Sequence, residues 1–428
     1  MARKKSMMNV SRSARCACAM LASLGLTTAA AAQPASAAPP SSAGQGSNAA
    51  SPARPSDSGD PGGDPGGDPG KHAREQASTT DASLPARRSS SWWSPLLSQI
   101  NQTGEGWTAR AGRIVSGGGL ALGQAYTKSV FEGRAQARAE MLFSVKGYLQ
   151  GELSLSSRPL GAGGLRVGGR LRYTDLAQED FFGFGQASST SMHTSYSDRM
   201  TDVSLVTTLA PRSWLHIEGT AGFLNHDIGR GRQSGVPSIE ERFTAQAVPG
   251  LDGGAQFIQA GVAAVVDLRD VAEAPRHGGW YRASLTHYEG VRGNGASFGA
   301  FDADVRQFIA VPGTSKHVLA LRGQVASTVG GADAEVPFFM MPRLGGSSLR
   351  GYEISRYTDR HLLAFSVEHR WDVHPKLQLV GFVDAGQVAS TFGDFGLERF
   401  QSSVGMGLRY RVGGHAALRL DVAAGSEG

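Results

Sequence analysis

Side chains alternate between two faces with a period of two along most of this chain, from Gly117 to its last residue, 428. In the segment 165–173, aliphatic and aromatic residues occupy one face and small or charged residues the other: Leu165, Val167, Gly169, Leu171 and Tyr173 against Arg166, Gly168, Arg170 and Arg172. The same alternation returns in 261–268, 403–411 and 417–422. Because successive side chains of a β-strand point to opposite sides of a sheet, the pattern predicts an all-β chain.

The composition of the polar face favours a membrane barrel over a soluble sandwich. In a sandwich, the polar face meets water and the apolar face meets a core. Here the polar face combines many glycines with many arginines, as expected of a barrel interior, and no helical period interrupts the strands. A sheet in lipid must close on itself because unpaired backbone groups are costly there. We therefore predict a transmembrane antiparallel β-barrel, with fourteen or fifteen candidate strands along the chain.

Hydropathy and connection lengths agree with this prediction. After the first 35 residues, no stretch approaches the roughly 18 consecutive apolar residues of a membrane helix, and the mean hydropathy of −0.22 is near neutral. Tight connections at 211–213 and 412–414 alternate with long ones at 225–255 and 330–357. Short turns at one end and long loops at the other are typical of outer-membrane barrels.

The N-terminal quarter of the chain lacks this pattern. Residues 1–32, with a basic start, a short apolar stretch and small residues at the end, predict a secretory signal peptide. Both cysteines, Cys16 and Cys18, lie within it, so disulfides and thiolate metal sites are excluded from the mature chain. Residues 33–90 are rich in Pro, Gly, Ser, Ala and Asp and predict a disordered linker. Residues 91–103 fit either a short amphipathic helix or a lead-in strand.

Three motifs near the C-terminus occur in a fixed order. The first runs from Gly345-Gly346 through Leu349-Arg350-Gly351-Tyr352, the second places Phe382, Asp384 and Gly386 at alternate positions, and the third is Gly405-Met406-Gly407-Leu408-Arg409. With Phe181–Gly185 and Asp267–Tyr281 before them, these motifs make residues 104–428 resemble the barrel of the BamA/TamA-type outer-membrane superfamily, the bacterial surface antigen family.

The resemblance implies a barrel of about 16 strands in the outer membrane of a Gram-negative bacterium. Two departures from the family pattern stand out. The linker 33–90 occupies the place of the periplasmic POTRA domains with which the family's translocases receive clients, so we expect a member without them. The sequence also stops at 425–428, where the resemblance places the closing strand, so we expect the last strand to be missing.

The resemblance also implies a site inside the barrel. In the family, the arginine of the first motif, carried by a loop folded into the lumen, meets the aspartate of the second; here these are Arg350 and Asp384. A desolvated guanidinium needs an anionic partner in bidentate geometry, which supports this pairing. Gly351 would allow a tight turn, Gly386 would leave room for the loop, and Glu368 with Arg370 would extend the network. The alternative is an ordinary surface turn with an exposed arginine.

Catalytic and cofactor motifs are weak, so we expect no enzyme, no cofactor and no metal site. Residues 346–349 do not form the G-x-S-x-G elbow of hydrolases. The glycine-rich stretch 118–123 does not open a helix, as a dinucleotide-binding loop must. His369 and His374 are better read as interfacial or solvated residues than as metal ligands. The net charge of +5 is too small and too scattered to suggest nucleic acid.

Three functions remain open at this point. The first is a barrel that helps a polypeptide or lipid client to insert into or cross the membrane, in contact with outer-membrane lipids and an envelope partner protein. The second is a passive, anion-leaning pore lined by inward arginines: Arg166, Arg170, Arg172, Arg322, Arg409 and Arg411. The third is a surface antigen or structural barrel without transport. Channel conductance would separate the second from the other two, and client crosslinking would identify the first.

Overall fold

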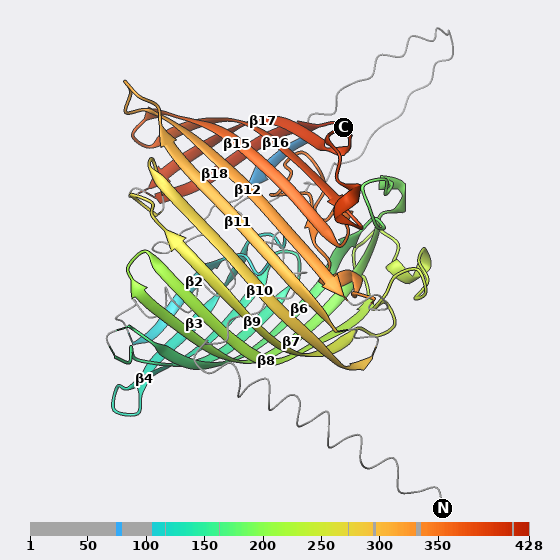
Figure 1. Cartoon of the computed structure of the whole chain (residues 1–428), viewed down its shortest axis with the longest axis horizontal. Coiled ribbons are helices and arrows are strands. Elements are labelled where there is room, and N and C mark those ends of the chain that lie inside the picture. The colour runs from blue at the N-terminus through green and yellow to red at the C-terminus, as the bar shows by residue number, and fades with distance from the viewer. Residues whose placement is uncertain are drawn as a thin grey trace, which may run out of the picture.

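The computed structural model describes residues 74–78, 105–115, 117–161, 163–272, 274–293, 297–330, 335–412 and 415–427. Its main feature is a single antiparallel sheet of sixteen strands that curls into a barrel-shaped wall (Figure 1). The predicted all-β architecture is confirmed. Among the described residues, no helix has the length and apolar character needed to cross a membrane.

Fifteen of the sixteen strands follow one another in chain order around the wall, each paired with its neighbours. They are β2 (Gly106–Gly112), β3 (Ala121–Val130), β4 (Ala135–Ser144), β5 (Leu149–Ser157), β6 (Arg166–Phe181), β7 (Thr194–Arg212), β8 (Leu215–Arg230), β9 (Ala255–Asp267), β10 (Gly278–Gly293), β11 (Phe298–Ala310), β12 (His317–Gly330), β15 (His361–His374), β16 (Leu377–Ala389), β17 (Gln401–Val412) and β18 (His415–Gly425).

The sixteenth strand, β1 (Arg74–Ser78), comes from the predicted linker. It pairs antiparallel with β18, from Arg74 opposite Ala423 to Ser78 opposite Arg419. The sheet order therefore begins at β1 and ends at β2. An unpaired strand edge offers free backbone donors and acceptors to any extended segment, which accounts for pairing where a linker was expected. The signal peptide, the rest of 33–90 and the segment 91–103 lie outside the described residues.

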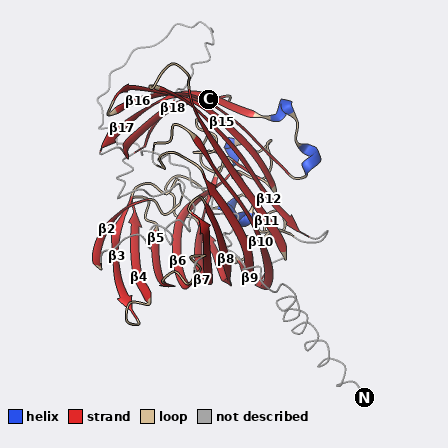
Figure 2. Cartoon of the chain, turned by 60° about the vertical axis from the view of Figure 1, so that its left-hand side comes forward, coloured by secondary structure: helices blue, strands red, loops and turns tan. Residues whose placement is uncertain are grey.

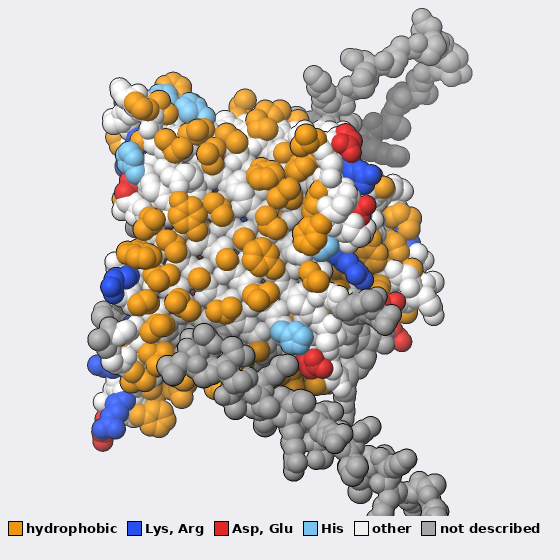
Figure 3. Space-filling view, in the orientation of Figure 1, with side chains coloured by type: hydrophobic (Ala, Val, Ile, Leu, Met, Phe, Trp, Pro, Cys, Tyr) orange, Lys and Arg blue, Asp and Glu red, His pale blue; other side chains and the backbone are white. Residues whose placement is uncertain are grey.

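The two faces of the wall carry the predicted residues. Leu171, Leu205 and Met406 point outward and are exposed, whereas Arg170 and Arg172 point inward and are buried. This arrangement is the reverse of a water-soluble protein, in which large apolar side chains turn inward. In Figure 3, hydrophobic side chains spread over the outer wall and most charged ones lie near its two rims. The outer face is thus suited to contact with lipid.

The longest connections all lie at one end of the wall, and those at the other end are mostly short. The long ones span 182–193, 231–254, 331–360 and 390–400 and gather at the right-hand side in Figure 1. At the other end, two residues suffice between β7 and β8 and between β15 and β16. The connection predicted for 225–255 spans only 231–254. It is shorter because His226 and Ile228 continue the inward-facing alternation of β8.

Aromatic residues fill the interior at the end with the long connections. The short 3-10 helix η3 (Phe338–Met340) packs with Phe181, Tyr196 and Phe257 of the wall in one buried apolar cluster. Phe338 meets the rings of Phe181 and Tyr196 edge-on, at centroid distances of 5.2 and 4.8 Å. The interior therefore includes a packed apolar region beside its charged wall. In Figure 2, loop segments lie inside the curl of the sheet.

Candidate functional site

The connection between β12 and β15 turns back into the barrel. Its two arms pair briefly as β13 (Arg343–Leu344) and β14 (Tyr357–Thr358). Two glycines make the turn between them feasible. Gly345 has φ +133°, and a Cβ there would lie 2.1 Å from the carbonyl oxygen of Glu353, while Gly351 has φ +92°. Residues with a side chain rarely adopt such angles, so both positions favour glycine.

Arg350, at the tip of this loop, is the centre of the site. Its Nε and Nη2 donate to the two carboxylate oxygens of Asp384 on β16, both at 2.6 Å, and its backbone amide donates to the same carboxylate at 3.2 Å. Nη1 donates to Glu368 of β15 at 2.8 Å, and Nη2 also donates to the hydroxyl of Ser366 at 3.0 Å. The side chains of Arg350 and Asp384 are only 3% and 1% exposed. The predicted pair therefore meets in the bidentate geometry that charged hydrogen bonds favour.

Packing around the pair fixes the guanidinium in place. Its carbon lies 3.4 Å from the ring centroid of Phe382, a cation–π contact. Gly386 leaves room for Leu344, because a Cβ at Gly386 would lie 2.6 Å from Cδ1 of that leucine. Leu349 is fully buried in the same apolar cluster as Leu344 and Tyr352. The aromatic ring, the glycine and the leucines thus hold the loop against β16.

The charge of Arg350 is balanced by more than one carboxylate. Burial opposes the charged form, but the hydrogen bonds to Asp384 and the nearby Glu368 and Asp421 raise the pKa of this loop arginine above its ordinary value. Asp421, on β18, lies 3.5 Å from Arg350. The loop tip is therefore tied to three strands of the wall: β15, β16 and β18.

Glu368 is the hub of a wider network on the inner wall. Its carboxylate accepts from Arg370 at 2.8 and 2.9 Å and from Arg409 on β17 at 3.0 and 3.1 Å. Arg419 of β18 lies 3.6 Å away and also pairs with Asp421. Opposite charges thus alternate from β15 to β18 across the inner face.

A second set of contacts ties the loop to the end of β18. The hydroxyl of Tyr352 donates to the carbonyl of Ser402 at 3.1 Å and accepts from the amide of Ser426 at 2.9 Å. Arg356 binds Glu427 through two hydrogen bonds, of 2.8 and 2.7 Å. Tyr357 donates to Glu427 at 2.6 Å. Ser426 and Glu427 lie at the last described residues of the chain, immediately after β18, whereas Ser402 lies on β17.

The same loop also touches the first strands and the connection after β6. The side chain of Ile354 packs on Gly117, between β2 and β3, where an added Cβ would lie 2.1 Å from its Cδ1. The amide of Gly185 donates to Thr358 at 2.9 Å, and Arg356 donates to the carbonyl of Ser188 at 2.6 Å. The loop therefore contacts elements next to both ends of the sheet order.

The structure brings all the predicted site residues together. Gly345, Gly346, Leu349, Arg350, Gly351 and Tyr352 form the loop, and Phe382, Asp384, Gly386, Glu368 and Arg370 line the strands under it. The alternative of an exposed arginine on a surface turn is wrong, because Arg350 is buried. The sequence did not predict four residues of these contacts: Ser366 and Asp421, which contact Arg350, and Arg356 with its partner Glu427. Of these, Asp421 carried a usable signal, since it lies on the inward face of a period-two strand.

Most of the arginines proposed to line an anion pore are paired. Arg170 binds Asp202 and Arg172 binds Glu152, both at 2.5 Å. Arg322 binds Asp304 at 3.0 Å, and Arg409 belongs to the Glu368 network. Paired carboxylates cancel most of the positive field that would attract anions.

The structure shows the surroundings of His369 and His374, which the sequence analysis weighed as metal ligands. No group of three or more His, Cys, Asp or Glu side chains that could hold an ion occurs among those residues. Nε2 of His369 lies 3.0 Å from Nδ1 of His317 on the neighbouring strand, and His374 accepts a hydrogen bond from the amide of Lys376.

A family model now decides what kind of barrel this is: the description "Omp85 superfamily domain" matches residues 133–426. The chain belongs to the Omp85 superfamily. The match includes all three C-terminal motifs and the inward loop. No curated protein sequence matches the chain.

One solved structure matches this chain with a TM-score above 0.5. The crystal structure of BamA from Haemophilus ducreyi lacking POTRA domains 1-3 matches with a TM-score of 0.54 and 14% identity, over 75% of this chain and 69% of that one. CdiB from Acinetobacter baumannii matches with a TM-score of 0.39 and 12% identity, over 74% of this chain and 59% of that one. CdiB from Escherichia coli matches with a TM-score of 0.42 and 13% identity, over 74% of this chain and 62% of that one. At such low identities, the BamA likeness concerns the Omp85 fold alone.

Proposed function

We propose that this Omp85 barrel works in the outer membrane of a Gram-negative bacterium, where it helps a polypeptide or a lipid to insert into or cross the membrane without enzymatic chemistry. Membership of the Omp85 superfamily and the lipid-suited outer wall support the location. The observation that carries the mechanism is the inward loop, which contacts Ser426 after β18 and Gly117 before β3. The loop thus contacts residues next to both ends of the sheet order, and this is where we propose that a client enters the wall.

The two attachments of the loop differ in strength. Arg350 and Asp384 are almost fully buried, and breaking a buried pair leaves an uncompensated charge at a cost of about 3–5 kcal/mol. The pair of Arg356 with Glu427 is more open to water, because the Glu427 side chain is 31% exposed although that of Arg356 is buried, and ion pairs in contact with water stabilise less than buried ones. We therefore propose that the loop tip is anchored to β15 and β16, and that the contacts of the loop with β18 and with the residues after it are the part that releases.

The pairing of the inner arginines argues against an open anion channel, and the aromatic cluster around Phe338 occupies part of the interior. We therefore favour controlled opening near β18 over passive conduction. Partners in this function would be outer-membrane lipids, a polypeptide or lipid client and an envelope protein that delivers the client.

A reversible disulfide tests this proposal. A Cβ at Gly351 would lie 3.4 Å from Cβ of Ala423 on β18, close to the ~3.5–4.5 Å of a disulfide. Replacing Cys16 and Cys18 with serine leaves G351C/A423C as the only cysteines. The probe is an unfolded outer-membrane barrel of eight strands. Its rate of insertion is measured in vesicles that contain this protein and in vesicles without it, and the ratio of the two rates is the acceleration.

Oxidation should abolish the acceleration of probe insertion, and reduction of the same sample should restore it. Reduction also serves as the control for strain at position 351, and each single-cysteine variant controls for oxidation elsewhere. Equal acceleration in the oxidised and reduced states would refute release of the loop as the gating step. Large steady channel currents in both states would favour the passive pore instead.

A further inference from the structure

The connection between β16 and β17 exposes large apolar side chains. It spans residues 390–400 and contains the short 3-10 helices η4 (Phe392–Asp394) and η5 (Leu397–Arg399). Leu397 is 91% exposed and Phe392 is 61% exposed. The connection lies at the right-hand side of Figure 1, below the C-terminus. Leu397 is thus the most exposed large apolar side chain of the described residues.

Several polar groups of this connection form hydrogen bonds within it or with Gln387 of β16. The carboxylate of Asp394 accepts from the hydroxyls of Ser390 and Thr391 at 2.9 and 2.7 Å and from the amide of Thr391 at 3.0 Å. The side chain of Gln387 donates to the carbonyl of Asp394 at 3.2 Å and accepts from the amide of Gly396 at 3.3 Å. The turn is therefore built to hold its apolar side chains outward.

Aromatic contacts connect this segment with the outer wall. The ring of Phe400 lies 6.2 Å from that of Phe365, an outward residue of β15. The ring of Phe392 stacks on His361, at the start of the same strand, with 4.1 Å between centroids. The apolar surface of 390–400 thus continues the membrane-facing surface of β15 past the rim of the sheet.

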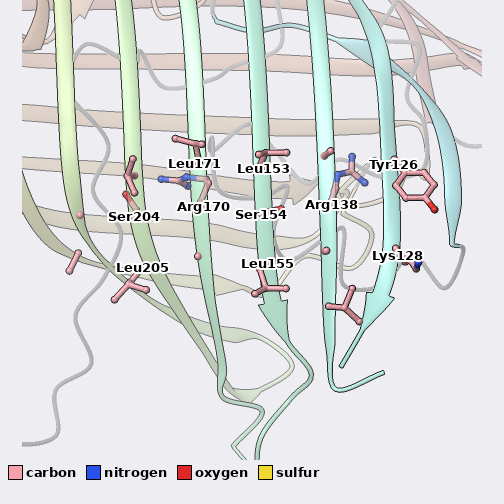
Figure 4. Close-up of a pocket in the computed structure, with 17 residues that line it drawn as sticks. Tyr126, Lys128, Arg138, Leu153, Ser154, Leu155, Arg170, Leu171, Ser204 and Leu205 are labelled. Atoms are coloured by element: carbon pink, nitrogen blue, oxygen red, sulfur yellow. The ribbon is translucent and has the colours of Figure 1, made fainter. Parts of the chain in front are cut away.

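The outer wall offers a contrasting surface on another part of the sheet, the strands β3 to β8. Over Ala137, Ala139 and Gly169, small outward residues leave a shallow apolar groove between Tyr126 and Leu205 (Figure 4). That groove is a hollow in a surface that lipid chains already cover, and it needs no special partner. The projecting side chains of 390–400 differ, because they lie beyond the strands.

We propose that residues 390–400 insert Phe392 and Leu397 into the interfacial layer of the membrane, as a wedge beside the last strands of the sheet. The inference rests on the proposed membrane location and adds to it a specific lipid-contacting segment. A lipid surface fits because apolar side chains on a turn with satisfied polar groups gain by leaving water. Glu398 and Arg399, also exposed, suit the headgroup region. The consequence is a locally disturbed bilayer next to β17 and β18.

The test measures immersion depth with spin labels. In the chain with Cys16 and Cys18 replaced by serine, a single nitroxide is placed at L397C, at F392C, at V367C on the outward face of β15, or at Q246C. Gln246 is exposed on the long connection between β8 and β9, at the same end of the barrel as 390–400. Each protein is reconstituted in vesicles of phosphatidylethanolamine and phosphatidylglycerol. Collision rates with apolar oxygen and with a water-soluble nickel complex give the depth.

We expect the labels at 397 and 392 to favour oxygen over nickel, as the wall label at 367 does, and the label at 246 to favour nickel. If the labels at 397 and 392 favour nickel, as the label at 246 does, while the label at 367 favours oxygen, the wedge is overturned and the membrane location stands. A segment that binds a protein instead of lipid would give the same result. A label at 367 that favours nickel overturns the membrane location itself. Two independent labelled positions guard against one variant that misfolds.

Discussion

Removing either partner of the buried pair at the loop tip should have unequal effects. Asp384 receives three hydrogen bonds from Arg350, through the backbone amide, Nε and Nη2. Arg350→Ala deletes two of these and leaves a buried carboxylate with its main positive partner gone. We expect a loss of about 3–5 kcal/mol in the free energy of unfolding, the usual cost of breaking a buried pair.

Asp384→Ala should cost less, because Arg350 keeps Glu368 at 2.8 Å and Asp421 at 3.5 Å. A loss of about 1–3 kcal/mol is expected from the missing hydrogen bonds. The double variant should be more stable than the sum of the single losses predicts, since the uncompensated charge is gone, with a coupling of at least about 1 kcal/mol. Arg230→Ala is the matched control: it breaks an exposed pair with Glu241 and should cost about 0–1 kcal/mol.

The assay is denaturant unfolding of the barrel in vesicles, followed by tryptophan fluorescence and by the migration difference between folded and unfolded protein on gels. Additive losses would refute the coupling. A larger loss for Asp384→Ala than for Arg350→Ala would refute the role given to Glu368 and Asp421 as supporting carboxylates.

Three other outcomes are expected. The protein should fractionate with outer membranes and migrate differently before and after heating; recovery as a soluble periplasmic species would contradict the membrane barrel. Gly386→Val should destabilise the barrel by about 1–3 kcal/mol through overpacking against Leu344, as measured by the same unfolding assay, whereas Gly381→Ala, with open space around it, should change little. Deleting residues 74–78 should speed hydrogen exchange at the amides of 419–423, which pair with β1; unchanged exchange would show that this pairing is absent in the membrane.

Much of the wall was predictable because it obeys a local rule. Alternation fixes which side of a strand each residue occupies, so inward Arg170 and outward Leu171 could be assigned from the sequence. Arg350 and Asp384 were joined by resemblance, since nothing local links residues 34 positions apart. The ends of strands were harder: β8 runs on to Arg230 although Asn225 and Asp227 interrupt its apolar pattern.

Contacts set by the path of the loop could not be predicted. Glu427 lies beyond β18 and shows no pattern, yet Arg356 and Tyr357 both bind it. The aromatic cluster around Phe338 was missed for a similar reason. Plain alternation along β6 would place Phe181 outward with Leu171 and Tyr173, but a register shift between Leu176 and Glu179 turns it inward. Alternation also does not say that η3 covers this ring. Such contacts depend on three-dimensional proximity between segments that lie 70 or more residues apart in the chain.

The partners of Arg350 also constrain the order in which the barrel assembles. They lie on β15, β16 and β18, all of which follow the loop in the chain. The loop cannot complete its charged contacts until the C-terminal strands exist, and contacts at large sequence separation form slowly. An arginine left inside an unfinished wall would be an unpaired charge. Docking of the loop and completion of the last strands should therefore be one cooperative step, so that a barrel interrupted before β18 fails as a whole.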